Sequence, residues 1–150
     1  PDCNTKLEQW LWLIDGSEDF AIIPGNTISG IPNDIPIKLN VGDQSFGERH
    51  VSIRHNSWVK RCMNHKSEYD KRLVPALLHK KLNQSGTIYE IGNKKFSILL
   101  RLTPNTTLIL KNMGQYLSVT SFYYKANSPD ELWIQKGKYL SSFGTKKKNI

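Results

Sequence analysis

Two Arg-His pairs lie five residues apart in the segment 46–55, at Arg49-His50 and Arg54-His55. Imidazole can accept and release a proton near neutral pH, and the planar guanidinium of arginine matches a phosphate group. We therefore expect acid–base chemistry on a phosphodiester, with His50 and His55 as candidate catalytic residues and Arg49 and Arg54 as candidate phosphate ligands. The competing interpretation is that these are ordinary surface histidines and solvated arginines.

The formal net charge of the 150-residue chain is +8, and it is unevenly distributed. Residues 1–45 hold two basic and seven acidic side chains, whereas residues 46–150 hold 19 basic and six acidic ones. The basic part of the chain, residues 46–150, is expected to attract a polyanion such as nucleic acid, or an acidic protein, because charge of one sign raises the local concentration of counter-ions. We expect an acidic, Pro/Gly-rich arm or entry segment over 1–45 and the functional domain over 46–150. A basic domain with no such partner is the alternative.

Several classes of protein are disfavoured by composition. No apolar run approaches the roughly 20 residues that span a bilayer, so no membrane insertion is expected. The two cysteines, Cys3 and Cys62, are too few for a disulfide scaffold, and whether they pair stays open. The chain does not begin with methionine, so we expect it to be a piece of a longer protein.

The pattern of hydrophobic residues predicts helices first and strands afterwards. Residues 6–14 fit a short helix or strand, and the prolines and glycines of 15–45 favour irregular or edge-strand structure. Helices are expected over 56–66 and from near 67 to 82, the second with an apolar face at Leu73, Leu77, Leu78 and Leu82. Pro75 marks either a kink in this second helix or its true start. Strands are expected at 87–91, 95–102, 107–111, 115–124 and 131–135.

The fold expected from this order is α+β. One or two N-terminal helices pack on a four- to five-stranded antiparallel meander, preceded by an irregular acidic arm, because such short turns join antiparallel neighbours.

Strand alternation extends the candidate site beyond the histidines. On the strand 115–124 it places Ser118, Thr120, Phe122 and Tyr124 on one face. On the strand 95–102 it places Lys95 and Arg101 on one face. We expect Ser118 and Thr120 to act beside the histidines, and Lys95, Arg101 and Tyr124 to bind phosphate. The alternatives are that serine and threonine merely favour exposed strands, and that the opposite face, with Ser121, lines the cleft.

A metal-dependent nuclease of the HNH type is the second enzyme hypothesis. Asn56, Cys62, His65 and Lys66 partly match the end of an HNH nuclease motif, but the upstream Asp-His pair of that family is absent. A third hypothesis is a basic nucleic-acid-binding module without enzymatic activity, which needs the same charge but no histidine.

The motif segment also carries a family resemblance. Residues 46–55, followed by helices and a meander ending in Tyr116–Phe122, resemble the superfamily of metal-independent ribonucleases that unites barnase, EndoU, colicin D and RelE. The turn placement over 86–89, 104–106 and 112–118 is similar to that of the colicin D tRNase domain. The resemblance covers roughly residues 46–124 and is nearest to bacterial toxin branches, including contact-dependent-inhibition toxins.

The resemblance implies an endoribonuclease toxin that cleaves RNA, with tRNA as the expected substrate, by attack of the ribose 2′-OH and without a metal or other cofactor. The family histidine falls on His50 or His55, its basic ligands on Arg49 and Arg54, and its polar strand residue on Ser118 or Thr120. This chain departs from colicin D in having two candidate histidines. The resemblance further implies an acidic immunity protein, delivery as part of a larger secreted or cell-surface protein, and action in the cytoplasm of a target cell.

Overall fold

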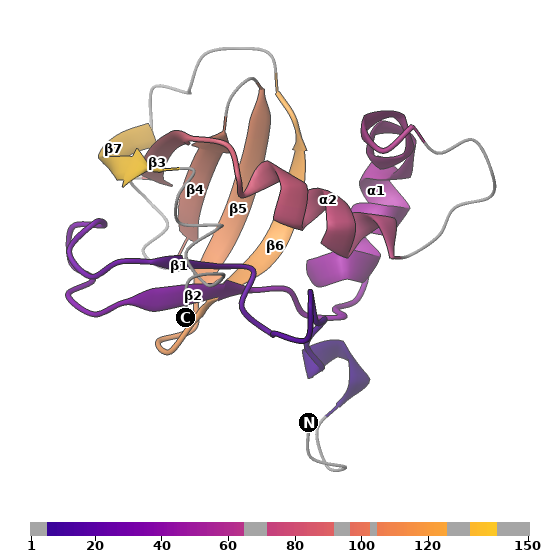
Figure 1. The fold of residues 1–150 in the computed structure, drawn as a ribbon, viewed down its shortest axis with the longest axis horizontal. Coiled ribbons are helices and arrows are strands. Elements are labelled where there is room, and N and C mark those ends of the chain that lie inside the picture. The colour runs from indigo at the N-terminus through magenta and orange to yellow at the C-terminus, as the bar shows by residue number, and fades with distance from the viewer. Residues whose placement is uncertain (1–5, 65–71, 92–96, 103–104, 126–132, 141–150) are drawn as a thin grey trace.

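The computed structural model describes residues 6–64, 72–91, 97–102, 105–125 and 133–140, and over these residues the chain forms two α-helices and seven strands (Figure 1). The predicted α+β class is confirmed. The elements in chain order are a short 3-10 helix η1 (Leu7–Gln9), β1 (Ala21–Ile23), β2 (Ile35–Lys38), α1 (Gly47–Cys62), α2 (Leu73–Lys81), β3 (Gly86–Ile91), β4 (Ser97–Leu102), β5 (Thr106–Asn112), β6 (Leu117–Tyr124) and β7 (Trp133–Tyr139).

The seven described strands form one sheet in the order β1-β2-β6-β5-β4-β3-β7. Strands β3 to β6 pair antiparallel with their chain neighbours, as their short connections require. The predicted four- to five-stranded meander is not matched, because β1 and β2 extend the sheet on one side and β7 extends it on the other. Strand β7 pairs with β3 and not with β6, since the outer edge of β6 is occupied by β2 and α1.

The N-terminal segment, predicted to be irregular or edge-strand structure, supplies β1 and β2, and β1 is an edge strand of the sheet. Within it, Ala21, Ile23, Ile35 and Ile37 are buried, so alternate residues of both strands enter the hydrophobic core. Strand β2 pairs in parallel with β6, with Ile37 opposite Leu117. The prolines and glycines keep the two strands short but do not prevent the pairing. The acidic segment is therefore part of the sheet, although it is largely free of regular structure elsewhere.

Helix α1 begins nine residues before the helix predicted at 56–66, and it therefore includes the Arg-His segment. It lies beside the edge of β6 that β2 leaves uncovered (Figure 1). Trp58 meets Phe122 of β6 edge to face, with ring centroids 6.0 Å apart. The last helical residue, Cys62, has a free thiol, and Cys3 lies outside the described residues.

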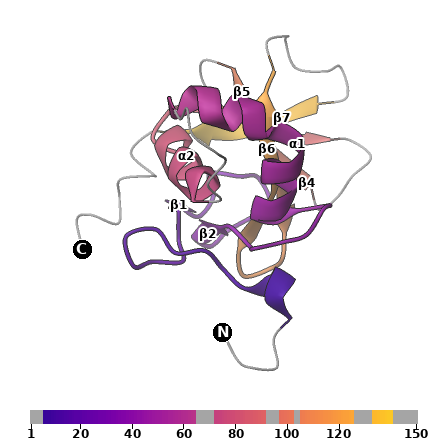
Figure 2. The ribbon, with the colours of Figure 1, turned by 90° about the vertical axis from the view of Figure 1, so that its right-hand side faces the viewer.

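Helix α2 covers the apolar face of the sheet and lies beside α1 (Figure 2). The predicted apolar face is confirmed for Leu77, Leu78 and Leu82, which are fully buried, while Leu73 packs against the core from its edge. Burial of each leucine contributes about 1.5–3 kcal/mol. The hydroxyl of Tyr139 in β7 donates a 2.6 Å hydrogen bond to the carbonyl of Leu82, which closes the end of α2. Within the described residues, neither helix offers the long apolar run that crossing a membrane requires.

Candidate active site

The start of α1 is held in place by the segment that leaves β2. The amide of Glu48 donates to the carbonyl of Asn40 and the amide of Arg49 to that of Val41, each at 3.0 Å. These bonds satisfy amides that would otherwise lack partners at a helix N-terminus. Gly47 has φ +77°, and an added Cβ would lie 2.7 Å from the carbonyl oxygen of Asn40. Only glycine fits this contact without displacing the backbone.

A tight turn precedes the helix. The carboxylate of Asp43 accepts hydrogen bonds from the Ser45 amide at 2.8 Å and from its hydroxyl at 2.7 Å. These bonds, led by the one from the hydroxyl, lower the pKa of Asp43 below its usual value. The turn also presents the carbonyl of Gln44 to His50, at 2.9 Å from Nδ1. Because a carbonyl only accepts, Nδ1 of His50 carries the proton, and Nε2 is the nitrogen that can exchange one with a substrate.

The two candidate histidines lie next to each other on α1. Their ring centroids are 6.0 Å apart and their planes are inclined by 80°, so the edge of one ring meets the face of the other. Ideal helical spacing would separate residues five apart around the helix. The helix is instead kinked at His55, which has φ −131° and ψ 18°. Non-helical dihedral angles inside a helix concentrate at functional positions.

The environment of His55 favours its neutral form. Burial lowers its pKa below the usual 6.5, and the positive charges of His50 and Arg54 lower it further. The imidazole also stacks on the ring of Tyr123 in β6, with centroids 5.5 Å apart. An imidazole that is neutral near pH 7 and fixed against an aromatic ring is suited to accept a proton.

The face of the sheet beneath Tyr123 carries buried polar groups. The register places Arg101, Thr107 and Tyr123 side by side on β4, β5 and β6, and Ser121 lies two residues from Tyr123 on the same face. Nη1 of Arg101, Oγ1 of Thr107 and Oγ of Ser121 are buried without a hydrogen-bond partner within the described residues. The other terminal nitrogen of Arg101 donates to the carbonyl of Lys125 at 2.9 Å. Unsatisfied buried donors are uncommon in native proteins and indicate a place where a ligand or water binds.

A β-bulge changes the predicted alternation on β6. Ile109 pairs with Ser121 and Leu110 with Val119, so Thr120 is the extra residue. Ser118, before the bulge, and Ser121, after it, therefore lie on the same face. The predicted row of Ser118, Thr120, Phe122 and Tyr124 does not exist as one surface, because Phe122 turns into the core against Trp58.

The bulge divides the candidate strand residues between two places. Ser118 and Thr120 line a cavity of about 510 Å³ together with Ser45 and Phe46. Tyr124 is 55% exposed and lies outside that lining. Ser121 and Tyr123, which the alternation assigned to the opposite face, join the polar group near His55 instead.

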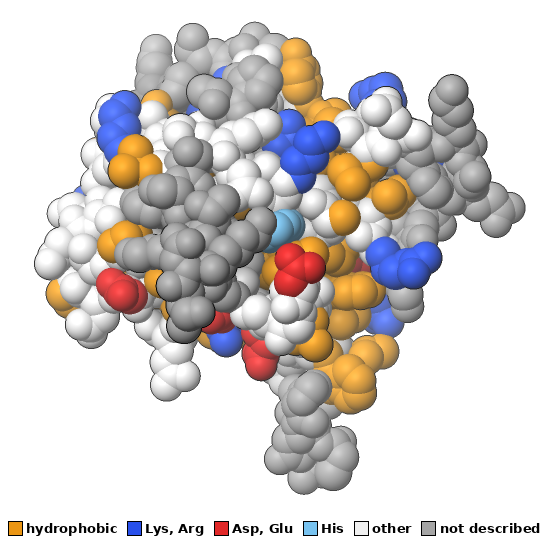
Figure 3. Space-filling model, in the orientation of Figure 1, with side chains coloured by type: hydrophobic (Ala, Val, Ile, Leu, Met, Phe, Trp, Pro, Cys, Tyr) orange, Lys and Arg blue, Asp and Glu red, His pale blue; other side chains and the backbone are white. Residues whose placement is uncertain are grey.

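The predicted basic ligands are also separated. Arg54 is exposed and adjoins His55, whose pKa its charge lowers. Arg49 lines a different cavity, formed with Trp10 and Trp12 of the N-terminal segment. Arg101 lies on the sheet face described above, and Lys95 lies outside the described residues. On the face of the molecule drawn in Figure 3, lysine and arginine side chains are scattered and do not form one basic patch.

Thr107, Tyr123 and Asn40 were not selected from the sequence, and Ser121 entered only through the alternative that the opposite face of the strand lines the cleft. The spacing of β-branched and aromatic residues located β5 and β6 but not the bulge that sets which side chains share a face. Of the residues in the HNH hypothesis, His65 and Lys66 lie outside the described residues. Among those that are described, no three His, Cys, Asp or Glu side chains gather as a metal site would require.

Comparisons with known proteins returned no match to a family model, a curated protein or a solved structure. The functional argument therefore depends on the arrangement of this chain's own side chains.

Proposed function

We propose that this chain is a metal-independent endoribonuclease that cleaves RNA through the ribose 2′-OH. The observation that carries the proposal is the pair of imidazoles 6.0 Å apart, one of them with a lowered pKa and stacked on the sheet. Internal transesterification requires one group that removes a proton and one that supplies a proton. Two adjacent histidines can take these two roles.

The two histidines have different roles in this proposal. His55, whose pKa is lowered, removes the proton from the 2′-OH as the 2′-oxygen bonds to phosphorus. His50, whose Nδ1 is committed to the carbonyl of Gln44, gives the proton on Nε2 to the 5′-oxygen as the P–O5′ bond breaks. The products are a 2′,3′-cyclic phosphate and a 5′-hydroxyl. Each general acid or base contributes about 10²–10⁴-fold to the rate.

Charge on the phosphoryl oxygens needs a second set of groups. Arg101, Thr107 and Ser121 are on the same face as Tyr123, and one buried polar atom of each (Nη1, Oγ1 and Oγ) has no partner within the described residues. Donors fixed before the substrate arrives stabilise developing charge without rearranging. This set replaces Lys95 and Tyr124 of the original hypothesis as the proposed phosphate ligands, and Arg54 contributes from the exposed side of His55.

The substrate class follows from the chemistry. The attacking group is the 2′-OH, which DNA lacks, so RNA is the substrate. The resemblance to toxin ribonucleases favours tRNA, and it favours an acidic partner protein that blocks the site in the producing cell. The net charge of residues 46–150 would speed the encounter with both, because opposite charges steer association.

The test is cleavage of total tRNA by the purified chain in the presence of EDTA, with analysis of the product ends. We expect 2′,3′-cyclic phosphate and 5′-hydroxyl ends, and no cleavage where the attacking nucleotide is replaced by its 2′-deoxy form. His55→Gln and His50→Gln are each expected to lower the rate at least 100-fold.

The matched control is His79→Gln, because His79 lies in the last turn of α2 and not on α1, and its replacement should leave the rate unchanged. Cleavage of DNA that requires a divalent cation would support the HNH hypothesis instead. Binding of RNA with no cleavage would support the non-enzymatic module. Equal loss in all three variants would show a general effect on folding.

A further inference from the structure

The cavity that includes Ser118 and Thr120 is a separate feature from the histidine pair. Its volume of about 510 Å³ is within the range of ligand pockets, roughly 300–1,000 Å³. It is lined by Gln9, Asn40, Ser45, Phe46, Lys111, Met113, Tyr116, Ser118 and Thr120. The lining therefore combines aromatic walls with a small number of amides and hydroxyls, which is typical of pockets that bind and orient a small ligand.

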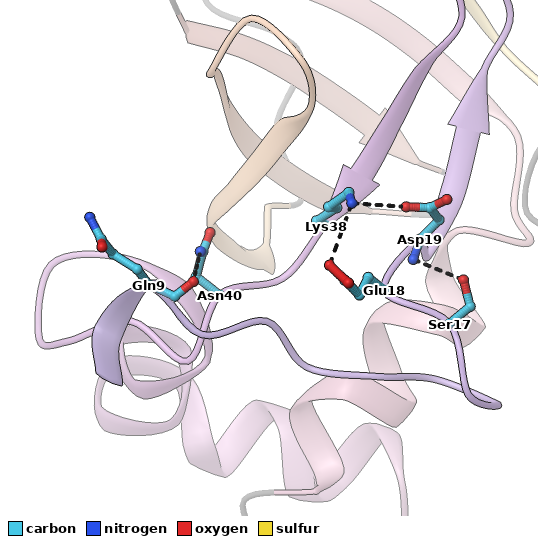
Figure 4. A network of polar contacts seen from close by, with 6 residues as sticks. All are labelled: Gln9, Ser17, Glu18, Asp19, Lys38 and Asn40. Atoms are coloured by element: carbon cyan, nitrogen blue, oxygen red, sulfur yellow. Dashed lines mark hydrogen bonds and ion pairs between the residues drawn. The ribbon is translucent and has the colours of Figure 1, made fainter. Parts of the chain in front are cut away.

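The polar floor of the cavity is fixed in orientation. The Ser118 hydroxyl donates to Oδ1 of Asn40 at 2.6 Å. Nδ2 of Asn40 donates to the carbonyl of Gln9 at 3.1 Å (Figure 4). Because the carbonyl can only accept, the amide cannot be flipped. Asn40 is 3% exposed and Ser118 4% exposed, so neither side chain can turn away. The remaining lone pairs of Ser118 and the second N–H of Asn40 give the cavity a defined pattern of acceptors and donors.

The aromatic wall formed by Tyr116 is held in position by residues outside the cavity. Lys38 lies over the ring of Tyr116, with Nζ 5.8 Å from the centroid. Its ammonium is in turn fixed by Glu18 and Asp19, at 3.5 and 3.4 Å (Figure 4). Two of the acidic residues of the N-terminal segment therefore help to position an aromatic wall. Exposed Lys111 lies at the rim of the cavity and supplies positive charge for a phosphate backbone.

The cavity and the histidine pair lie on one continuous strip of the sheet. Ser118 and Tyr123 are on the same face of β6 and pair with Lys111 and Thr107, four positions apart on β5, or about 13 Å at a strand rise of about 3.3 Å. The bulged residue Thr120 lines the cavity between them. The turn that supplies Ser45 to the cavity also supplies the Gln44 carbonyl to His50. A single extended strand of nucleic acid can therefore contact both places.

We propose that this cavity binds a nucleobase of the RNA strand, at a nucleotide beside the one that is cut. The base lies against Tyr116 and Phe46, and its polar edge meets Ser118 and Asn40. This inference rests on the proposed ribonuclease function and adds a sequence preference to it. Stacking on an aromatic side chain strengthens binding about 5- to 150-fold per base. The fixed amide and hydroxyl then discriminate between bases, because an unmatched edge leaves buried polar groups unpaired.

The test is binding of four 2′-O-methyl tetranucleotides, each with one base repeated, by isothermal titration calorimetry. The 2′-O-methyl group prevents the proposed cleavage, so binding is measured on the unaltered protein. We expect one or two of the four sequences to bind at least tenfold more tightly than the others. Tyr116→Leu should weaken the preferred sequence about tenfold, and Ser118→Ala should reduce the preference among the bases.

The matched controls are Tyr89→Leu on β3 and Ser29→Ala, both outside this cavity. Met113→Ala is a second probe, since this rim residue is 48% exposed and its loss should not unfold the chain. It should weaken the preferred sequence more than the controls do. Equal binding of all four sequences by the wild-type chain, or unchanged binding in both Tyr116→Leu and Met113→Ala, would overturn the inference.

The two proposals can fail separately. Base-selective binding that depends on Tyr116, without RNA cleavage, would retain the cavity as a base site and reject the ribonuclease. RNA cleavage that depends on His55, with no selectivity lost in the cavity variants, would retain the ribonuclease and reject the base site.

Discussion

The imidazole of His55 is stacked on the phenol ring of Tyr123, with ring centroids 5.5 Å apart and ring planes inclined by 23°. This contact joins the kink of α1 to the part of β6 that follows the bulge. It places the candidate base above the sheet face that carries Arg101 and Thr107. Stacked aromatic rings at this separation contribute about 0.5–1.5 kcal/mol beyond the burial of their area. The position of the imidazole is therefore set by the sheet as well as by the helix.

Tyr123 is expected to act as a positioning residue. Tyr123→Leu removes the stacked ring, and we expect kcat for RNA cleavage to fall about 10- to 100-fold, since small displacements of a catalytic group cost factors of this size. Tyr123→Phe keeps the ring and should restore most of kcat, with KM little changed in both variants. Equal losses in the two variants would show that the hydroxyl, and not the ring, matters.

The pH dependence of cleavage should identify His55 as the base. Its pKa is below 6.5, chiefly because of burial and then because of the charges of His50 and Arg54. A base acts when deprotonated, so kcat/KM should rise with pH through a midpoint below 6.5. Arg54→Gln removes one positive charge, which makes protonation easier, raises the pKa of His55 and moves this midpoint to higher pH. Because Arg54 is also a proposed phosphate ligand, Arg54→Gln should lower the rate at every pH, so the shift of the midpoint is the result that identifies the base.

The control for the pH profile is Arg61→Gln, which removes an exposed arginine from the last turn of the same helix. Its midpoint should match that of the wild type, since Arg61 is not among the groups that shift His55. A shift toward lower pH in Arg54→Gln would contradict the assignment of the base.

Thr107→Val should separate activity from stability. The threonine hydroxyl is buried and has no partner within the described residues, and valine has nearly the same shape. Removing an unsatisfied buried hydroxyl is neutral or stabilising, whereas losing a partnered one costs about 1–3 kcal/mol. We therefore expect an unchanged or higher free energy of unfolding and a reduced cleavage rate. Ser121→Ala should behave in the same way.

The matched control for this pair is Thr106→Val, a buried threonine whose neighbouring position on β5 points it to the opposite face of the sheet. It should leave the cleavage rate unchanged. A clear loss of stability in Thr107→Val would mean that its hydroxyl makes a bond within the folded chain, and would remove Thr107 from the proposed phosphate site.

Local patterns in the sequence located most of the strands and the apolar face of α2. Alternating β-branched and aromatic residues placed β3, β4, β5 and β6 within two residues of their observed starts, because strand pattern and short turns are encoded by neighbours in the chain. The parallel pairing of Ile37 with Leu117 joins residues far apart in sequence, and no local pattern specifies it. The start of α1 was missed for a similar reason, since its first amides are held by Asn40 and Val41.

The candidate site was predictable only in part. His50 and His55 were found because imidazole is uncommon and chemically specific. Ser121 and Tyr123 were assigned to the wrong side of the proposed cleft relative to Ser118, because one extra residue in a strand reverses the alternation that follows it. No glycine marks the position of the bulge in β6, so the sequence alone does not reveal it.

The attachment of α1 to the segment after β2 is open to a direct test at Gly47. Alanine there has to adopt φ near +77° and also meets the carbonyl oxygen of Asn40 at 2.7 Å. Gly30→Ala is the matched control, since Gly30 has φ +92° but no heavy atom within 4 Å of an added Cβ. Gly30→Ala should lower the free energy of unfolding by about 1–2 kcal/mol, because alanine is strained at a positive φ. Gly47→Ala should cost about 1–3 kcal/mol more, because the backbone around Asn40 has to move. Denaturant unfolding measures both values.

The same two variants also test activity. Since the same backbone positions His50, Gly47→Ala should also slow cleavage under conditions where the variant remains folded, whereas Gly30→Ala should not. Equal destabilisation of the two variants, with equal cleavage rates, would mean that the contact with Asn40 does not hold the helix in place.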